Sequence, residues 1–160
     1  MLRRLAFASS LALAITFRFS PMPKPQPDPA LIRALAALYY GEDRATPTQD
    51  EANLVADTVF SRTGLAGYPD NPVDVIRQPK QYSPFNPTDP NYPAVSTFDE
   101  RHPDWARFSE LARNAIAAPR RGLTHYFTGT PPAWAGALKD TFKQGEHTYG
   151  REERRRKRPR

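Results

Sequence analysis

Proline is the residue that most restricts how this chain can fold. The sequence has 18 prolines among 160 residues, and each one fixes a backbone dihedral and removes an amide donor. Long helices and central β-strands are therefore expected only where proline is absent. This distribution favours short regular elements joined by ordered loops, and the length is sufficient for one domain with its own core.

The first 19 residues have the layout of a secretory signal. Arg3 and Arg4 precede an uncharged run over residues 5–17 that is rich in Ala, Leu and Ser. The run is short for a transmembrane helix, which needs about 20 residues. We interpret residues 1–19 as a signal peptide or a weak signal-anchor, the alternative being an N-terminus without an export role. In residues 20–29 every second residue is a proline, which predicts an extended linker. Because of the signal-like segment before it, the chain is expected in the periplasm or cell envelope, free or tethered to the inner membrane.

Residues 31–44, LIRALAALYYGEDR, predict an apolar helix that ends in a carboxylate. Asp28 and Pro29 supply a good N-cap and first helical residue, and Gly41 marks the expected end. The apolar face is expected to consist of Leu31, Leu35, Leu38 and Tyr39. Glu42 then lies at the tip of the helix, where a general acid could sit, although most glutamates in such places are simply solvated.

Three further helices are predicted. One starts at a capping box, in which Thr48 and Glu51 satisfy each other's backbone donors, and it ends at Gly64. Residues 72–77 predict a short helix, and residues 103–118 a third long helix that Pro119 stops.

Two kinds of segment are expected to be extended. Residues 78–93 contain four X-Pro bonds after position 82, which argue against a helix or a central strand. A long ordered loop there would form either a groove wall or a plain surface crossing. Residues 123–127 and 146–149 are strand candidates that could pair. The expected fold class is mainly α with a small β element (α+β).

Several site chemistries are excluded or disfavoured by composition. Cysteine is absent, which excludes disulfides, thiolate metal sites and a cysteine nucleophile. The histidines His102, His125 and His147 are widely spaced, and neither a metal-binding helix motif nor a serine nucleophile elbow occurs. We therefore expect no metal and no cofactor.

Most of the net charge of +6 lies at the C-terminus. Residues 151–160 hold seven Arg or Lys and two Glu, so the other residues are close to neutral. We interpret Arg151–Arg160 as a basic tail, either simply solvated or attracted to an anionic membrane or envelope surface. Nucleic acid is not the expected partner, because the body of the chain is not basic.

Five short motifs follow one another in an order that resembles the SleB-type cell wall hydrolases, a family found in spore-forming bacteria and bacteriophages. They span about 120 residues. Any one of them is unspecific, but their order is not. In this sequence they are 38–44 (LYYGEDR), the helix 51–62 ending in Ser61-Arg62, 75–83 (VIRQPKQYS), 124–127 (THYF) with Trp134, and 145–149 (GEHTY).

This resemblance implies a hydrolase domain over residues 30–150 with a fold similar to lysozymes and lytic transglycosylases. It implies cleavage of peptidoglycan glycan strands between N-acetylmuramic acid and N-acetylglucosamine, with Glu42 as the single catalytic acid and base. The pKa of Glu42 would be raised by burial, and no second carboxylate or metal would be needed. The residues expected to line the sugar groove are Gln81, Tyr82, Ser83, His125, Tyr126 and His147.

The chain also departs from the family pattern. Asp43 replaces a small residue, Ser61 replaces an asparagine, and residues 45–47 replace a Gly-Glu pair. For Tyr82 and Tyr126, core packing is an alternative to sugar stacking, and His125 and His147 could be structural. The alternative function is a non-catalytic peptidoglycan-binding envelope or virion protein. Whether water or the muramic acid 6-hydroxyl attacks the sugar is left open.

Overall fold

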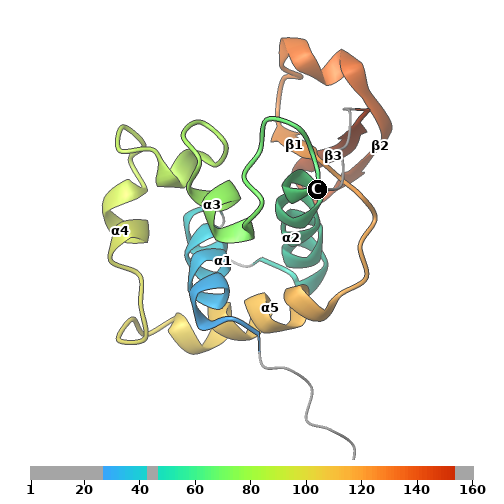
Figure 1. Ribbon diagram of the computed structural model, residues 1–160. Helices are drawn as coiled ribbons and strands as arrows, with labels where there is room; N and C mark the ends of the chain where they lie inside the picture. The colour runs from blue at the N-terminus through green and yellow to red at the C-terminus, as the bar shows by residue number, and fades with distance from the viewer. Residues whose placement is uncertain (1–26, 43–46, 154–160) are drawn as a thin grey trace, which may run out of the picture.

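The computed structural model describes residues 27–42 and 47–153. They form a helical body with a three-stranded antiparallel sheet, an α+β arrangement (Figure 1). The predicted signal segment, most of the linker, Asp43 and residues 154–160 lie outside the described residues. In chain order the elements are α1 (Pro29–Glu42), α2 (Gln49–Thr63), α3 (Pro72–Arg77), η1 (Ser83–Phe85), α4 (Tyr92–Ser96), α5 (Trp105–Ala117), β1 (His125–Thr128), η2 (Ala133–Ala137), β2 (Leu138–Gln144) and β3 (His147–Glu152).

Helix α1 is the centre of the core. Its N-cap is as predicted, because the Asp28 carboxylate accepts from the Ala30 amide at 2.9 Å. The helix is buried on nearly all sides, so it is a core helix and not the one-faced helix that the apolar spacing suggested. The buried residues are Leu31, Ile32, Ala34, Leu35, Ala36, Ala37, Leu38, Tyr39 and Gly41.

Gly41 does not end α1, as the sequence suggested, but lies inside its last turn. A Cβ at this position would lie 2.5 Å from the Pro84 Cβ and 2.7 Å from the Val95 Cγ2. The glycine is therefore explained by close packing, since η1 and α4 pass directly over the last turn of α1. This packing fixes the depth at which the next residue, Glu42, is held.

Helix α2 starts and ends where the sequence predicts. Both halves of the capping box are present, with the Thr48 hydroxyl accepting from the Glu51 amide and the Glu51 carboxylate accepting from the Thr48 amide. Gly64 follows its last residue. Helices α1 and α2 both pack against α5, which crosses beneath them in Figure 1.

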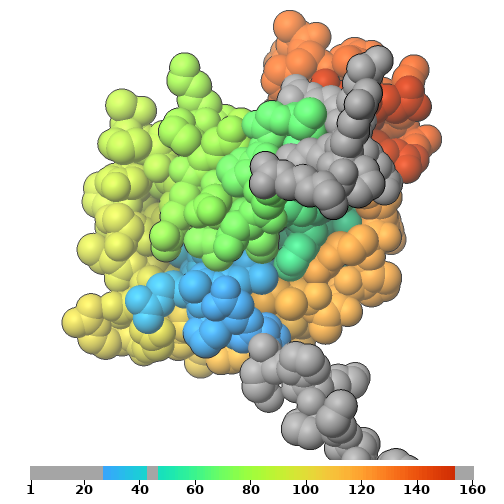
Figure 2. Space-filling view, viewed as in Figure 1, coloured from blue at the N-terminus to red at the C-terminus, as the bar shows by residue number. Residues whose placement is uncertain are grey.

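The proline-rich segment is not a loop throughout, so this part of the prediction was wrong. The prolines do not prevent short helical turns, because Pro84 lies in the first turn of η1 and Pro93 in the first turn of α4, where no amide donor is needed. Figure 2 shows the segments after α2, coloured green to yellow, covering the centre and left of one face, with α1 in blue below them.

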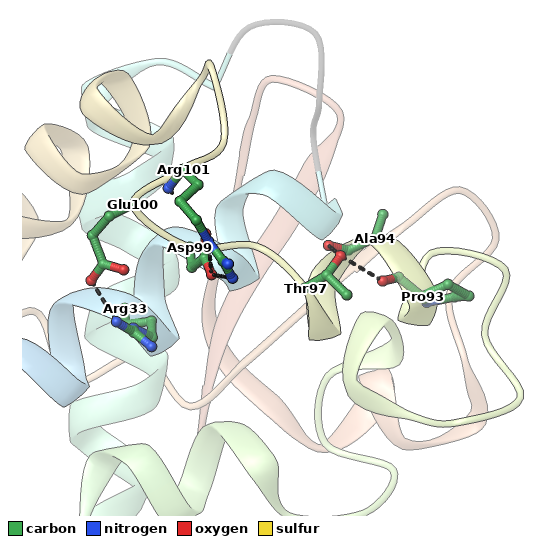
Figure 3. A network of polar contacts seen from close by, with 7 residues as sticks. All are labelled: Arg33, Pro93, Ala94, Thr97, Asp99, Glu100 and Arg101. Atoms are coloured by element: carbon green, nitrogen blue, oxygen red, sulfur yellow. Dashed lines mark hydrogen bonds and ion pairs between the residues drawn. The ribbon is translucent and has the colours of Figure 1, made fainter.

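Surface polar contacts hold the connection between α4 and α5 against α1 (Figure 3). Arg33 of α1 pairs with Glu100 at 2.5 Å, and Arg101 pairs with Asp99. The Thr97 hydroxyl donates to the Pro93 carbonyl at 3.1 Å and so closes α4. Exposed ion pairs of this kind contribute little to stability, so they orient the connection more than they stabilise the fold.

The sheet has the strand order β1-β3-β2, and the two predicted strand segments do pair. Tyr126 of β1 lies opposite Tyr149 of β3. Strand β2 completes the sheet, with a bulge between Lys139 and Phe142. Strand β3 continues through Arg151 to Glu152, which are the first two residues of the segment interpreted as a basic tail.

A buried carboxylate ties the entrance of β1 to α2. The Asp57 carboxylate accepts from three successive amides, those of Arg121 at 3.0 Å, Gly122 at 3.4 Å and Leu123 at 2.8 Å. Gly122 has a φ of +80°, which lets successive amides point at one anion. This anchor sets the position from which β1 carries Tyr126 toward the end of α1.

Within residues 27–42 and 47–153, we find no helix with both the length and the apolar character required to cross a bilayer.

Candidate functional site

Glu42, the last residue of α1, has an unusual protonation equilibrium. Burial raises the pKa of its carboxyl from 4.5 to about 7, and the nearby Asp89 carboxylate also raises it, while Tyr126 lowers it. Its place at the C-terminal end of a helix, where the peptide dipoles present partial negative charge, likewise disfavours the anion. Near neutral pH a substantial fraction of this carboxyl is therefore protonated and able to donate a proton.

A cleft of about 360 Å³ opens beside Glu42. It is formed where the end of α1, the end of α2, the segment before and within η1, and the edge of the sheet meet. The residues that line it are Glu42, Arg62, Lys80, Gln81, Ser83, Asn86, Tyr126, Phe127, Thr128 and His147. Four residues predicted to bind substrate, Gln81, Ser83, Tyr126 and His147, are thus brought together with Glu42.

The wall that carries Gln81 and Ser83 is shaped by local backbone contacts. Lys80 has a φ of 66°, and its amide donates to the Asn86 side chain at 2.9 Å. The Gln81 amide donates to the Gln78 carbonyl at 3.2 Å. These turns fold the chain back on itself and present successive polar side chains to the cleft.

Tyr126 and His147 come from the sheet. Their rings lie 5.2 Å apart in an edge-to-face arrangement. The Tyr126 hydroxyl lies close enough to the Glu42 carboxyl to lower its pKa. The approach does not meet hydrogen-bond geometry, however, and this buried hydroxyl has no hydrogen-bond partner among the described residues. Tyr126 therefore lies beside the Glu42 carboxyl without a hydrogen bond to it.

Tyr82 does not line the cleft, so its prediction as a groove residue was wrong and the core-packing alternative describes it. Its side chain is only 2% exposed, and its hydroxyl shares a 3.1 Å hydrogen bond with Thr58. It lies beneath the cleft and supports the Tyr126 ring, whose centroid is 6.3 Å away.

His125 also lies outside the cleft, contrary to the prediction. It is the first residue of β1, and the cleft is lined by the three residues that follow it. The His125 ring lies 5.1 Å from the Trp134 ring and 3.6 Å from the Glu152 carboxylate. The structural role considered for this histidine describes its position.

Four residues with charged or amide side chains near Glu42 were missed by the sequence reasoning. Arg62, Lys80 and Asn86 line the cleft, and Asp89 acts on the Glu42 carboxyl through its charge. Arg62 stood in a recognised motif but only as the end of a helix. No local pattern marked the others, because their proximity to Glu42 depends on how the proline-rich segment folds over α1.

A larger hollow of about 810 Å³ lies at the other end of the sheet, lined in part by Arg120, Arg121 and Arg151. None of the predicted site residues lines it. Arg120 donates to two carbonyls of α5, and Arg151 pairs with Asp140. We assign the candidate site to the smaller cleft, because that cleft contains the carboxyl whose protonation is displaced.

In the part of the chain that the structure describes, no three His, Cys, Asp or Glu side chains lie together in an arrangement that could hold a metal ion. The side chains that line the cleft offer one protonatable carboxyl, two cations, amides, hydroxyls and an imidazole.

Comparison of the chain with models of protein families, with curated proteins and with solved structures gave no match.

Proposed function

We propose that this protein is a peptidoglycan glycosidase that cleaves the bond between N-acetylmuramic acid and N-acetylglucosamine. The observation that supports it most is a carboxyl with a pKa of about 7 beside a polar cleft. The order of motifs similar to the SleB-type hydrolases gives this carboxyl its role. We include in the proposal a lysozyme-like or lytic-transglycosylase-like architecture for the helical body.

In the proposed reaction Glu42 donates its proton to the glycosidic oxygen as the bond from that oxygen to the muramic acid C1 breaks. The electron pair of the bond leaves with the oxygen, and positive charge develops at C1. The resulting Glu42 carboxylate then accepts a proton from the attacking hydroxyl. Attack by the muramic acid 6-hydroxyl gives a 1,6-anhydro end, whereas attack by water gives a reducing end.

The remaining cleft residues would bind and orient the glycan. Gln81 and Ser83 present hydrogen-bonding groups from one wall, and His147 presents an imidazole from the other. Tyr126 would lie against the Glu42 carboxyl and shield it from water. A half-buried ring of this kind also offers an apolar face to a sugar.

We also propose that residues 1–19 direct export of the protein to the periplasm or envelope. A second proposal is that the basic C-terminal residues are attracted to an anionic surface. Fusion of residues 1–29 to a reporter that is active only after export tests the first proposal. A reporter that stays inactive would contradict it.

The function is tested with purified protein in a peptidoglycan zymogram. Replacing Glu42 by Gln removes the proton donor and keeps the shape, and general acid catalysis is worth roughly 10²–10⁴-fold, so clearing should nearly vanish. Glu110→Gln is the matched control, since Glu110 is exposed on α5. Equal clearing by the Glu42 variant would show that Glu42 is not the acid.

If neither protein clears peptidoglycan but both sediment with it, the alternative of a non-catalytic peptidoglycan-binding protein is supported. If clearing occurs, mass analysis of the released muropeptides distinguishes the two reactions, because an anhydro end is lighter than a reducing end by one water.

A further inference from the structure

Arg62 is a buried cation at the edge of the cleft. It occupies the last turn of α2 and is only 5% exposed. Its Nε donates to the Thr124 carbonyl at 2.7 Å, and its guanidinium carbon lies 5.0 Å from the Tyr82 ring centroid and 5.5 Å from that of Tyr68. One edge of the group is thus held by the backbone, and its face packs on aromatic rings.

The other edge of the guanidinium is not satisfied by the protein. Its Nη1 is buried and has no acceptor among the described residues. Arg120 provides the contrast, since its Nη1 and Nη2 donate to the carbonyls of Ala115 at 2.9 Å and Ile116 at 2.8 Å. A buried charged donor without a partner is costly, and the cost is removed when a ligand supplies the acceptor.

The charges of the cleft favour an anionic ligand. Its described lining contains two cations, Arg62 and Lys80, and one carboxyl, Glu42. The groups that displace the protonation of Glu42 are its burial, Tyr126 and Asp89, and Arg62 is not one of them. Arg62 instead acts on the phenols of Tyr82 and Tyr126. Its charge is therefore available to a ligand without removing the proton from the acid.

We infer that Arg62 binds a carboxylate of the substrate through its unsatisfied guanidinium edge. A planar guanidinium is the side chain best suited to a carboxylate. The identification of this carboxylate as part of peptidoglycan rests on the proposed function. Peptidoglycan offers two sources, the lactyl carboxylate of muramic acid in strands that carry no stem peptide, and the carboxylates of the stem peptides themselves. In the first case an amidase-type reaction that removes the peptides would have to supply the substrate.

The test measures binding to the Glu42→Gln protein, so that no cleavage is required. Three oligosaccharides of equal length are compared by calorimetry at low salt: chitotetraose, which has no carboxylate, the peptide-free glycan tetrasaccharide with free lactyl carboxylates, and the same tetrasaccharide with stem peptides attached. A charge-assisted contact with a carboxylate predicts binding about 10- to 100-fold tighter than chitotetraose for the ligand that supplies it. Preference for the peptide-free ligand identifies the lactyl source, and preference for the peptide-bearing ligand alone identifies the stem peptide.

Variants then assign that preference to a residue. Arg62→Gln should abolish it, and Arg62→Lys should restore part of it. Arg120→Gln, at an arginine that does not line the cleft, serves as the control that retains it, and Lys80→Gln tests the other cation of the cleft. Equal binding of all three oligosaccharides, or a preference that survives Arg62→Gln, would overturn the inference. If neither Arg62 variant folds, the Lys80→Gln variant decides between the two cations, because Lys80 is exposed and its replacement should not disturb the fold. If Lys80→Gln loses the preference, the carboxylate binds Lys80 and the inference is overturned. If Lys80→Gln keeps the preference, Arg62 is the cation that binds it.

The binding experiment and the clearing assay can give opposite answers, so the inference and the proposed function can be rejected independently. A protein that clears peptidoglycan but binds all three ligands equally keeps the function and loses the inference. A protein that does not clear peptidoglycan but shows an Arg62-dependent preference keeps the inference and loses the glycosidase.

Discussion

Asp57 on α2 and Glu42 at the end of α1 are both removed from water, yet their surroundings differ. The Asp57 carboxylate accepts from three backbone amides at 2.8–3.4 Å. Among the described residues Glu42 has no such set of donors, and the groups there that act on its pKa are the Tyr126 hydroxyl, outside hydrogen-bond geometry, and the Asp89 carboxylate. The comparison teaches that two carboxyls removed from water can be given very different hydrogen-bonding surroundings. A buried carboxyl keeps its proton when the protein withholds the donors that would stabilise the anion.

The largest expected effect on stability comes from replacing Asp57, the carboxylate whose hydrogen bonds to backbone amides are formed. Asp57→Ala leaves three amides of the α5–β1 connection without their acceptor, and we expect a loss of about 3–5 kcal/mol in the free energy of unfolding. Denaturant unfolding measures it. Asp57→Asn, which keeps an acceptor oxygen, should lose less. A loss below about 1 kcal/mol for the alanine variant would show that this carboxylate does not anchor β1.

Glu42→Gln should have the opposite effect on stability. The folded-state pKa of Glu42, about 7, lies above its unfolded value of 4.5, so the wild-type protein loses stability as the pH rises between these values. The variant carries no charge and escapes this loss. We expect it to be about 2–3 kcal/mol more stable at pH 8 and equally stable at pH 4, as measured by denaturant unfolding. An equal gain in the free energy of unfolding at pH 4 and pH 8 would contradict the raised pKa of Glu42.

Tyr126→Phe probes the neighbour that lowers the pKa of Glu42. Without the hydroxyl the pKa of the carboxyl should rise, so the decline of activity at high pH should move to higher pH, by less than about one unit. The measurement is the pH dependence of kcat/KM on soluble glycan. Tyr149→Phe is the matched control, because its hydroxyl is also buried without a hydrogen-bond partner among the described residues. An equal shift in both variants would remove the special role of Tyr126.

Asp89→Asn should give the smallest change in the pH dependence of activity, in the direction opposite to that of Tyr126→Phe. Removing its negative charge lowers the pKa of Glu42, so the same decline should move to lower pH. The asparagine still accepts from the Asn91 amide, which Asp89 does at 2.8 Å. Asp74→Asn, an exposed change on α3, serves as the charge control. Complete loss of activity in Asp89→Asn would instead indicate that Asp89 is a second catalytic carboxylate.

Local rules predicted most helices well, because their signals lie within a few residues of each other. The capping box at Thr48 and Glu51, the cap at Asp28 and the short helix 72–77 are all confirmed. The proline-rich segment was predicted less well. Its prolines were treated as helix breakers, whereas those in η1 and α4 occupy first turns, where proline is tolerated.

The candidate site was predicted in part, and its errors have one cause. Gln81, Ser83, Tyr126 and His147 do line the cleft with Glu42, but Tyr82 and His125 do not. Motif order identifies a segment that approaches a site without stating which side chain of the segment points inward. That choice depends on which part of β1 borders the cleft and on the turn at Lys80, both of which follow from the packing of neighbouring elements.

The sequence by itself determined that a carboxyl stands at the end of an apolar helix, that the other long helices fall in stretches without proline, and that thiol chemistry is excluded. Only the tertiary structure decided that the pKa of the half-buried Glu42 carboxyl is raised, that Asp89 lies close enough to act on it, and that Arg62 has an edge at the same cleft with no acceptor in the described part of the chain. The physical reason is that solvent exclusion and hydrogen-bond partnership are properties of several segments brought together, and no spacing within one segment encodes them.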